Sequence, residues 1–252
     1  MAKTIKTLQA LRGERYFRWR GGDVSRLEGL TDAVMALAMT LLIVSFEVPE
    51  TWGEMTTIFR QVPVLLICFS MMVMLWFYNF QFHRRFGLEN IYTVVLNAVF
   101  MFLVLVYVYP LKFLFSVLVG RVLGGEQANP GDIDGVSMMV IYSSGVFAIF
   151  GVLFLMNMHA YKHRDTLELD LAERHLTRAT LREHAIHMSF GLASILLALA
   201  ASEDHPWLVS ASGMVYFGVG PAQGFAGFAS GRKLRATLAR EAAIANATTE
   251  RN

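Results

Sequence analysis

The chain has 252 residues, of which 55% are hydrophobic, and a mean hydropathy of +0.45. This composition is too apolar for an ordinary soluble domain and indicates an integral membrane protein. The single cysteine, Cys68, excludes an intrachain disulfide, and the net charge of +2 is informative only through its distribution along the chain.

Apolar segments of about 20 residues, the length that crosses a bilayer core, follow one another along the chain. A turn-rich loop at 124–135 separates the first three from the last three. The pattern predicts an all-α, polytopic membrane protein with six transmembrane helices, at residues 30–47, 61–82, 91–118, 136–158, 185–202 and 207–229.

Lysine and arginine are unevenly distributed between the two sides of the predicted membrane. All but three of the 22 fall in residues 1–26, in the second-to-third and fourth-to-fifth connections, or in residues 232–252. Basic residues favour the cytoplasmic side, so both termini are predicted to be cytoplasmic. The predicted parts are a basic cytoplasmic N-terminal segment (1–25), a six-helix transmembrane domain (26–232) that includes a cytoplasmic helical connection (161–184), and a cytoplasmic C-terminal tail (233–252).

The first apolar segment has a regular pattern of side chains. One face of the predicted helix carries residues at helical spacing, namely Leu37, Thr40, Leu41, Val44 and Glu47. Such a stripe is typical of a helix packed in a core, and it is also what the wall of a pore requires. The residues alone leave both interpretations open.

The first three segments also carry a set of motif residues. In the first segment these are Arg26, Leu30, Thr31, Asp32, Thr40, Leu41, Leu42 and Pro49. In the second and third they are Pro63, Phe69, Ser70, Trp76, Asn97 and Pro110. Over roughly residues 26–115 this set resembles the transmembrane protein 175 family of potassium channels. Leu30 and Thr31 replace the family's Phe and Ser, while Asn79 stands where the family usually has a His, the nearest histidine being His83.

The resemblance implies a bacterial-type potassium channel of the cell membrane, here the inner membrane, with one six-helix repeat per chain. It also implies a homotetramer around the first helices, with K+ as the permeant ion and the lipid bilayer as surroundings. No cofactor, enzymatic step or nucleic acid is expected. Residue by residue, the pore constriction carries over to Leu37, Leu41 and Val44, with Thr40 as a hydroxyl layer. Such a lining predicts modest selectivity for potassium over sodium, because it coordinates ions less definitely than a cage of carbonyls does.

The resemblance further implies a polar network that holds the first helix, formed by Arg26, Thr31, Asp32, Trp76 and Asn97. Asp32 lies about 140° around the helix from Leu37, so it points away from the pore face. A carboxylate at that position needs partners, and Asp32→Ala is expected to abolish folding or assembly.

Glu47 continues the pore face toward the outside. From the residues, we expect a ring of Glu47 carboxylates at the outer mouth, which would attract cations and repel anions. In the resembling family the acidic residue usually comes earlier, at the position of Ser45.

Other chemistry has weaker support in the sequence. Two histidine pairs, His159 with His163 and His184 with His187, have metal-ligand spacing, but they lie at the cytoplasmic interface and the sequence offers no third ligand. Nucleotide-binding, hydrolase and metalloprotease motifs do not occur in the sequence, nor does a TVGYG-type filter loop. A proton-conducting channel and a secondary transporter of the inner membrane stay open as alternatives. A transporter would often show repeated halves and ionisable residues near the bilayer midplane, and neither is clear here.

Overall fold

The structure, a computed structural model, describes residues 16–44, 48–123, 134–202 and 204–249. These residues form helices and connections without a strand, which confirms the all-α prediction. The last two α-helices follow each other through a 3-10 turn without a break. In chain order the elements are α2 (Arg26–Val44), α3 (Trp52–Phe86), α4 (Ile91–Leu123), α5 (Gly135–Lys162), α6 (Leu171–Leu199), α7 (Trp207–Met214), η2 (Val215–Gly218) and α8 (Val219–Thr249).

Four helical segments are long and apolar enough to cross a membrane: α2, α3, residues Ile91–Val117 of α4, and α5. They correspond to the first four predicted spans. The fifth predicted span, 185–202, coincides only with the second half of α6, because the first half of that helix belongs to the charged connection at 161–184. The predicted sixth span, 207–229, is divided among α7, η2 and α8. The fifth and sixth spans therefore stay predictions.

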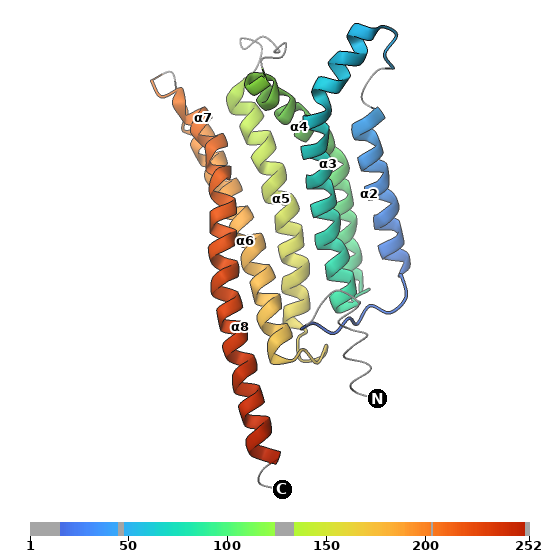
Figure 1. Cartoon of the computed structure of the whole chain (residues 1–252), viewed down its shortest axis with the longest axis vertical. Coiled ribbons are helices and arrows are strands. Elements are labelled where there is room, and N and C mark those ends of the chain that lie inside the picture. Colours follow the sequence, from blue (N-terminus) through green and yellow to red (C-terminus); the bar gives the residue numbers. More distant parts are fainter. Residues whose placement is uncertain (1–15, 45–47, 124–133, 203, 250–252) are drawn as a thin grey trace.

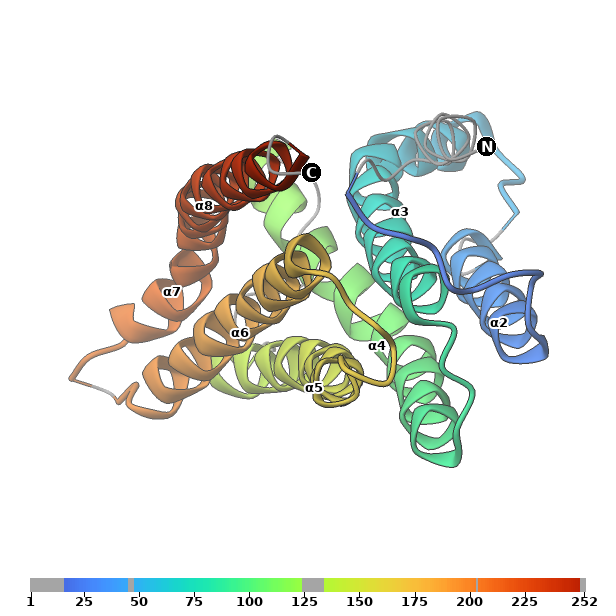
Figure 2. The same cartoon turned by 90° about the horizontal axis from the view of Figure 1, so that it is seen from below.

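Helix α4 lies between two groups of helices (Figures 1 and 2). α2 and α3 pack on one side of it and α5 packs on the other, while α6 packs on α5 and in turn carries α7 and α8. In Figure 1 the described chain begins at the end of the bundle toward which α8 extends. That arrangement places the two ends of the described chain on the same side, as the prediction for the termini requires.

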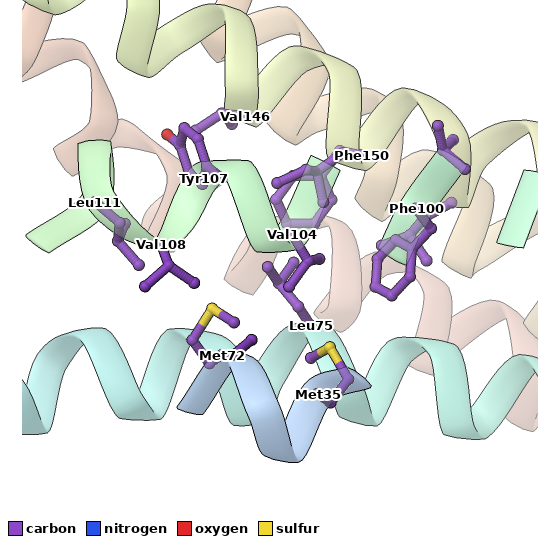
Figure 3. Packing of buried hydrophobic residues seen from close by; sticks show 14 of the residues in the cluster. Met35, Met72, Leu75, Phe100, Val104, Tyr107, Val108, Leu111, Val146 and Phe150 are labelled. Carbon is purple, nitrogen blue, oxygen red and sulfur yellow. The ribbon is translucent and has the colours of Figure 1, made fainter. Parts of the chain in front are cut away.

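The core runs through α2, α3, α4 and α5 (Figure 3). It is built from apolar side chains that interdigitate across these helices, among them Met35, Met72, Leu75, Phe100, Val104 and Phe150. Lipid tails are as apolar as these side chains, so removal from water is not what holds the helices together in a bilayer. Close packing and interhelical hydrogen bonds have to do so instead.

Residues 17–21, which we call the N-terminal strap, cross the lower end of the bundle before α2 begins. Phe17 is buried, with its ring edge against the Phe86 ring at 5.6 Å between centroids. The backbone N–H groups of Arg20 and Gly21 both donate to the carbonyl of Arg84, at 3.1 and 3.2 Å. The strap thereby ties the start of α2 to the end of α3.

Gly87 makes this close approach feasible. It caps α3 in the left-handed conformation, with φ of 58°, and its N–H donates to the carbonyl of His83. A Cβ atom at Gly87 would lie 3.1 Å from the nitrogen of Gly21 and 3.2 Å from backbone atoms of Arg20. Only glycine combines this backbone angle with the space that the strap needs.

The strap also binds the start of α6. The guanidinium of Arg20 forms an ion pair with Glu173, at 2.6 Å between Nη2 and Oε2, and donates to the carbonyls of Leu167 and Glu168. Glu173 completes a capping box with Asp170, so the same carboxylate fixes both the strap and the first turn of α6. The predicted connection 161–184 comprises the end of α5, the turn at 163–170 and the first half of α6. Most of the predicted tail 233–252 continues α8.

Glu173 is 2% exposed, and two opposing effects act on its pKa. Burial raises the pKa, while hydrogen bonds from Arg20 and from the N–H groups of Arg18 and Asp170 lower it, and the net shift is downward. A lowered folded-state pKa means that the ionised carboxylate stabilises the fold above the ordinary pKa. This contribution is lost as the pH falls through the folded value.

We expect Glu173→Gln to lower the free energy of unfolding at neutral pH by about 3 kcal/mol, because it leaves a largely buried Arg20 without its counter-ion. The deficit should shrink at acid pH, as the pH falls through the lowered pKa of Glu173 and the wild-type carboxylate also becomes protonated. Thermal unfolding of the purified protein in detergent, from acid to neutral pH, measures both effects. Glu168→Gln is the matched control, because that side chain is 80% exposed and should unfold as wild type does. A deficit that does not change with pH would contradict the assignment.

Candidate functional site

One face of α2 packs against the rest of the chain. Its buried residues recur every three or four positions: Glu28, Thr31, Met35, Ala38 and Leu42. Within the part of the chain that the structure describes, this helix contacts α3 and α4 and no other helix. The side of α2 opposite these residues is therefore left uncovered in the single chain.

The residues predicted to line a pore lie on that uncovered side. Leu37 is 53% exposed and Val44 is 67% exposed, although both are large apolar side chains. Thr40 is exposed between them, and its hydroxyl donates to the carbonyl of Ala36 at 2.8 Å, so the oxygen keeps its capacity to accept. Leu41 is half-buried and packs against the core, so it lies at the border of the stripe. Glu47 lies outside the described residues.

A chain of hydrogen bonds holds the buried side of α2 to its neighbours. The amide of Asn97 on α4 donates to Thr31 Oγ1 at 2.6 Å, and the amide of Asn79 on α3 donates to Asn97 Oδ1 at 2.7 Å. The Thr31 hydroxyl in turn donates to the carbonyl of Leu27 at 2.9 Å. All three side chains are buried, so each bond satisfies a polar group that the apolar surroundings would otherwise leave without a partner.

Asp32 makes a direct polar contact between α2 and α3. Its Oδ1 accepts a hydrogen bond from the indole N–H of Trp76 at 2.8 Å, and the Trp76 ring stacks on Phe80 at 5.3 Å between centroids. The structure thus brings together four of the five predicted network residues, Thr31, Asp32, Trp76 and Asn97. The side chain of Arg26, the fifth, is exposed and makes no hydrogen bond or ion pair with the described residues.

Asn79 and His83 both face this network. His83 is buried one turn after Asn79 on α3, with its Nε2 3.5 Å from Asn97 Oδ1. Asn79 therefore contacts the network from the position where the resembling family usually has a histidine, and His83 lies against the same amide oxygen.

Sequence reasoning missed an ion pair beside the network. Glu28 Oε1 and Arg84 Nε lie 3.0 Å apart, with the Glu28 side chain almost fully buried. Glu28 is three residues before Thr31, which puts it on the same helix face, so helical spacing alone contained a signal for its burial. Its partner, Arg84, lies far along the chain, and no pattern in the sequence indicated that the two would pair.

The histidine pairs are engaged in contacts within the protein. His159 Nε2 lies 2.8 Å from the Asn90 amide nitrogen, while His187 stacks on Phe150 at 3.9 Å between ring centroids. His184 is buried. Among the described residues no group of three or more His, Cys, Asp or Glu side chains is placed to hold a metal ion.

The long apolar helices, the first of which is covered on one side only, define a polytopic helical membrane protein. The profile of a family described as endosomal/lysosomal potassium channel TMEM175 matches residues 26–110. A potassium channel of Marivirga tractuosa is 33% identical over 226 residues, which are 86% of this chain and 91% of that protein.

Two solved structures have a similar fold. A crystal structure of a variant of the potassium channel MtTMEM175, in complex with a nanobody–MBP fusion protein, has a TM-score of 0.77 at 31% identity and covers 87% of this chain and 98% of that one. A lysosomal potassium-selective channel TMEM175 homologue from Chamaesiphon minutus shares the fold, with a TM-score of 0.53 at 16% identity over 81% of this chain and 96% of that one. The chain belongs to the TMEM175 family of potassium channels, which confirms the resemblance. Its relatives are ion channels and not enzymes.

We expect Asp32→Ala to reduce sharply the yield of folded, assembled protein, because it leaves the Trp76 indole N–H without its acceptor and removes a charge-assisted bond of about 1.5–3 kcal/mol. Size-exclusion chromatography of the membrane extract measures the yield. Trp76→Phe should reproduce part of the loss by removing the donor alone, while Asp23→Ala, an exposed aspartate before α2, should behave as wild type. Wild-type yield and conductance from Asp32→Ala would refute the role of this contact.

Proposed function

We propose that this protein conducts potassium passively across the cell membrane, in a bacterium the inner membrane, through a homotetrameric pore lined by α2. The observation that carries the proposal is the exposure of Leu37 and Val44 on the side of α2 that its own chain leaves uncovered. A symmetric assembly around this side would cover the apolar stripe and make a continuous wall. The names of the relatives as potassium channels support K+ as the permeant ion.

The constriction in this proposal is made of apolar rings. Four copies of Leu37, Leu41 and Val44 would stack along the axis at intervals of about 6 and 4.5 Å, from the rise of 1.5 Å per residue. Such rings hold ions back by excluding the water that hydrates them. Because Leu41 is half-buried in its own chain, Leu37 and Val44 would make the larger share of the constriction.

Thr40 supplies the polar layer between these rings. Its hydroxyl hydrogen is engaged with the Ala36 carbonyl, so four hydroxyl oxygens could turn toward a cation as it passes. Side-chain oxygens of this kind coordinate less rigidly than backbone carbonyls, which is why the proposed preference for potassium over sodium is modest. Glu47 would form the outer mouth and raise the local concentration of cations.

Purified protein in liposomes tests the function directly. With a potassium gradient, wild type should pass K+ and should be slowed only moderately when Na+ competes, and the reversal potential should follow the potassium gradient. A reversal potential that follows an imposed pH gradient instead would favour the proton-conducting alternative. Uptake coupled to a second ion would favour a secondary transporter.

We expect Leu37→Ala to raise potassium flux several-fold, because a shorter side chain widens one of the proposed apolar rings and lowers the cost of hydrated passage. The measurement is K+ flux in liposomes at equal protein density. Ile43→Ala is the matched control, since Ile43 is equally exposed on α2 but lies outside the stripe, and its flux should match that of wild type. Unchanged flux from Leu37→Ala would remove Leu37 from the constriction.

A further inference from the structure

A cavity of about 340 Å³ lies between the end of α3, the first half of α6 and α8. It is separate from the uncovered side of α2, and it lies at the level of the basic connections that predict the cytoplasmic face. Its wall combines apolar residues with several polar and charged side chains. The groups that matter are Arg85, Thr180, Arg182, Glu183, Gln223 and Ser230.

Two arginines line this cavity, and they differ in how far contacts within the protein hold their side chains. Arg85 is held in place, because its Nη1 donates to Thr180 Oγ1 at 3.0 Å and its guanidinium lies over the Phe17 ring at 5.1 Å. The side chain of Arg182 is exposed and makes no hydrogen bond or ion pair with the described residues. One arginine is therefore positioned by the fold, and the other is available to a ligand.

The one carboxylate among the residues that line the cavity already accepts a hydrogen bond from the protein. Glu183 accepts a hydrogen bond from the hydroxyl of Tyr78 on α3, and its backbone carbonyl accepts from the Gln223 amide at 2.9 Å. With two arginines against one glutamate, the wall carries net positive charge. A cation would meet two guanidinium groups here, so the cavity suits an anion.

The hydroxyl of Ser230 adds a neutral hydrogen-bonding group at the α8 side of the cavity. It lies 2.9 Å from His175 Nε2, which fixes its position opposite α6. Guanidinium groups bind phosphate through paired hydrogen bonds, and hydroxyl groups complete such sites. Basic pockets between helices on the cytoplasmic side of a membrane protein meet a leaflet rich in anionic phospholipid.

We propose that this cavity binds a phosphate-bearing anion, with Arg182 and Arg85 as the principal ligands. The anion can come from two sources, the headgroup of an anionic phospholipid or free phosphate in the cytoplasm. The proposal is independent of ion conduction, because its readout is binding.

Native mass spectrometry of the purified full chain in detergent tests this, with phosphatidylglycerol, phosphatidylcholine and inorganic phosphate as probes. Wild type should bind phosphatidylglycerol more tightly than phosphatidylcholine. Arg182→Gln should weaken phosphatidylglycerol binding about tenfold, the loss of one charge-assisted hydrogen-bonded contact. Arg178→Gln is the control, since Arg178 lies one turn earlier on α6, is exposed and donates to the Tyr161 hydroxyl outside the cavity.

A second variant tests the cavity without removing charge. Gly227 lines the cavity and has open space around its missing Cβ, so Gly227→Trp should obstruct the site and reduce phosphatidylglycerol binding by a similar factor. Gly220→Trp, two turns earlier on α8 and equally open, should bind as wild type does.

The phosphate arm identifies the source of the anion. Competition by millimolar inorganic phosphate, or phosphate binding without lipid binding, would support a soluble anion at this site, whereas lipid binding that resists phosphate would support a headgroup. Equal binding of phosphatidylglycerol by wild type and both variants would overturn the proposal. So would equal affinity of wild type for phosphatidylcholine, or no binding of any probe.

Discussion

The arrangement of this protein depends on a short chain of buried hydrogen bonds, from Asn79 through Asn97 to Thr31. In a bilayer the helices gain little from burying apolar surface, since lipid offers the same environment. Polar side chains are different, because an unpaired amide in the core costs about 1–3 kcal/mol. Three such groups that satisfy one another select one rotation of α2, and that rotation decides which of its faces is left uncovered.

Charged contacts reinforce the same choice at the end of the bundle where the strap lies. Glu28 pairs with Arg84, and the strap places Arg20 against Glu173, so the start of α2 is tied to both α3 and α6. Each of these carboxylates is almost fully buried, which makes loss of its partner costly. The first helix is thus anchored near its start, while its apolar stripe extends toward the opposite end of the bundle.

The two sides of α2 carry different kinds of side chain, and this difference bears on how a channel without a carbonyl filter could work. The polar groups that need partners are on the packed side of α2, where they find them within the chain. Leu37 and Val44 need no hydrogen bonds, so they can lie exposed on a single chain, and in the proposed tetramer the neighbouring subunits would cover them. An apolar constriction is compatible with that arrangement, because its selectivity rests on the exclusion of water and not on a rigid cage.

The sequence by itself determined the helical class, the first four membrane-spanning helices and the family, because segment length, apolar periodicity and motif spacing are local properties of the chain. It also identified Thr31, Asp32, Trp76 and Asn97 as residues that should meet, although only through the family resemblance. The tertiary structure alone decided that Arg26 stands apart, that Asn79 and His83 share one amide oxygen, and that Glu28 and Glu173 pair with Arg84 and Arg20. Periodicity tells which face of a helix is buried, but the partner on the other side comes from a distant part of the chain, and only the packing of the helices brings the two together.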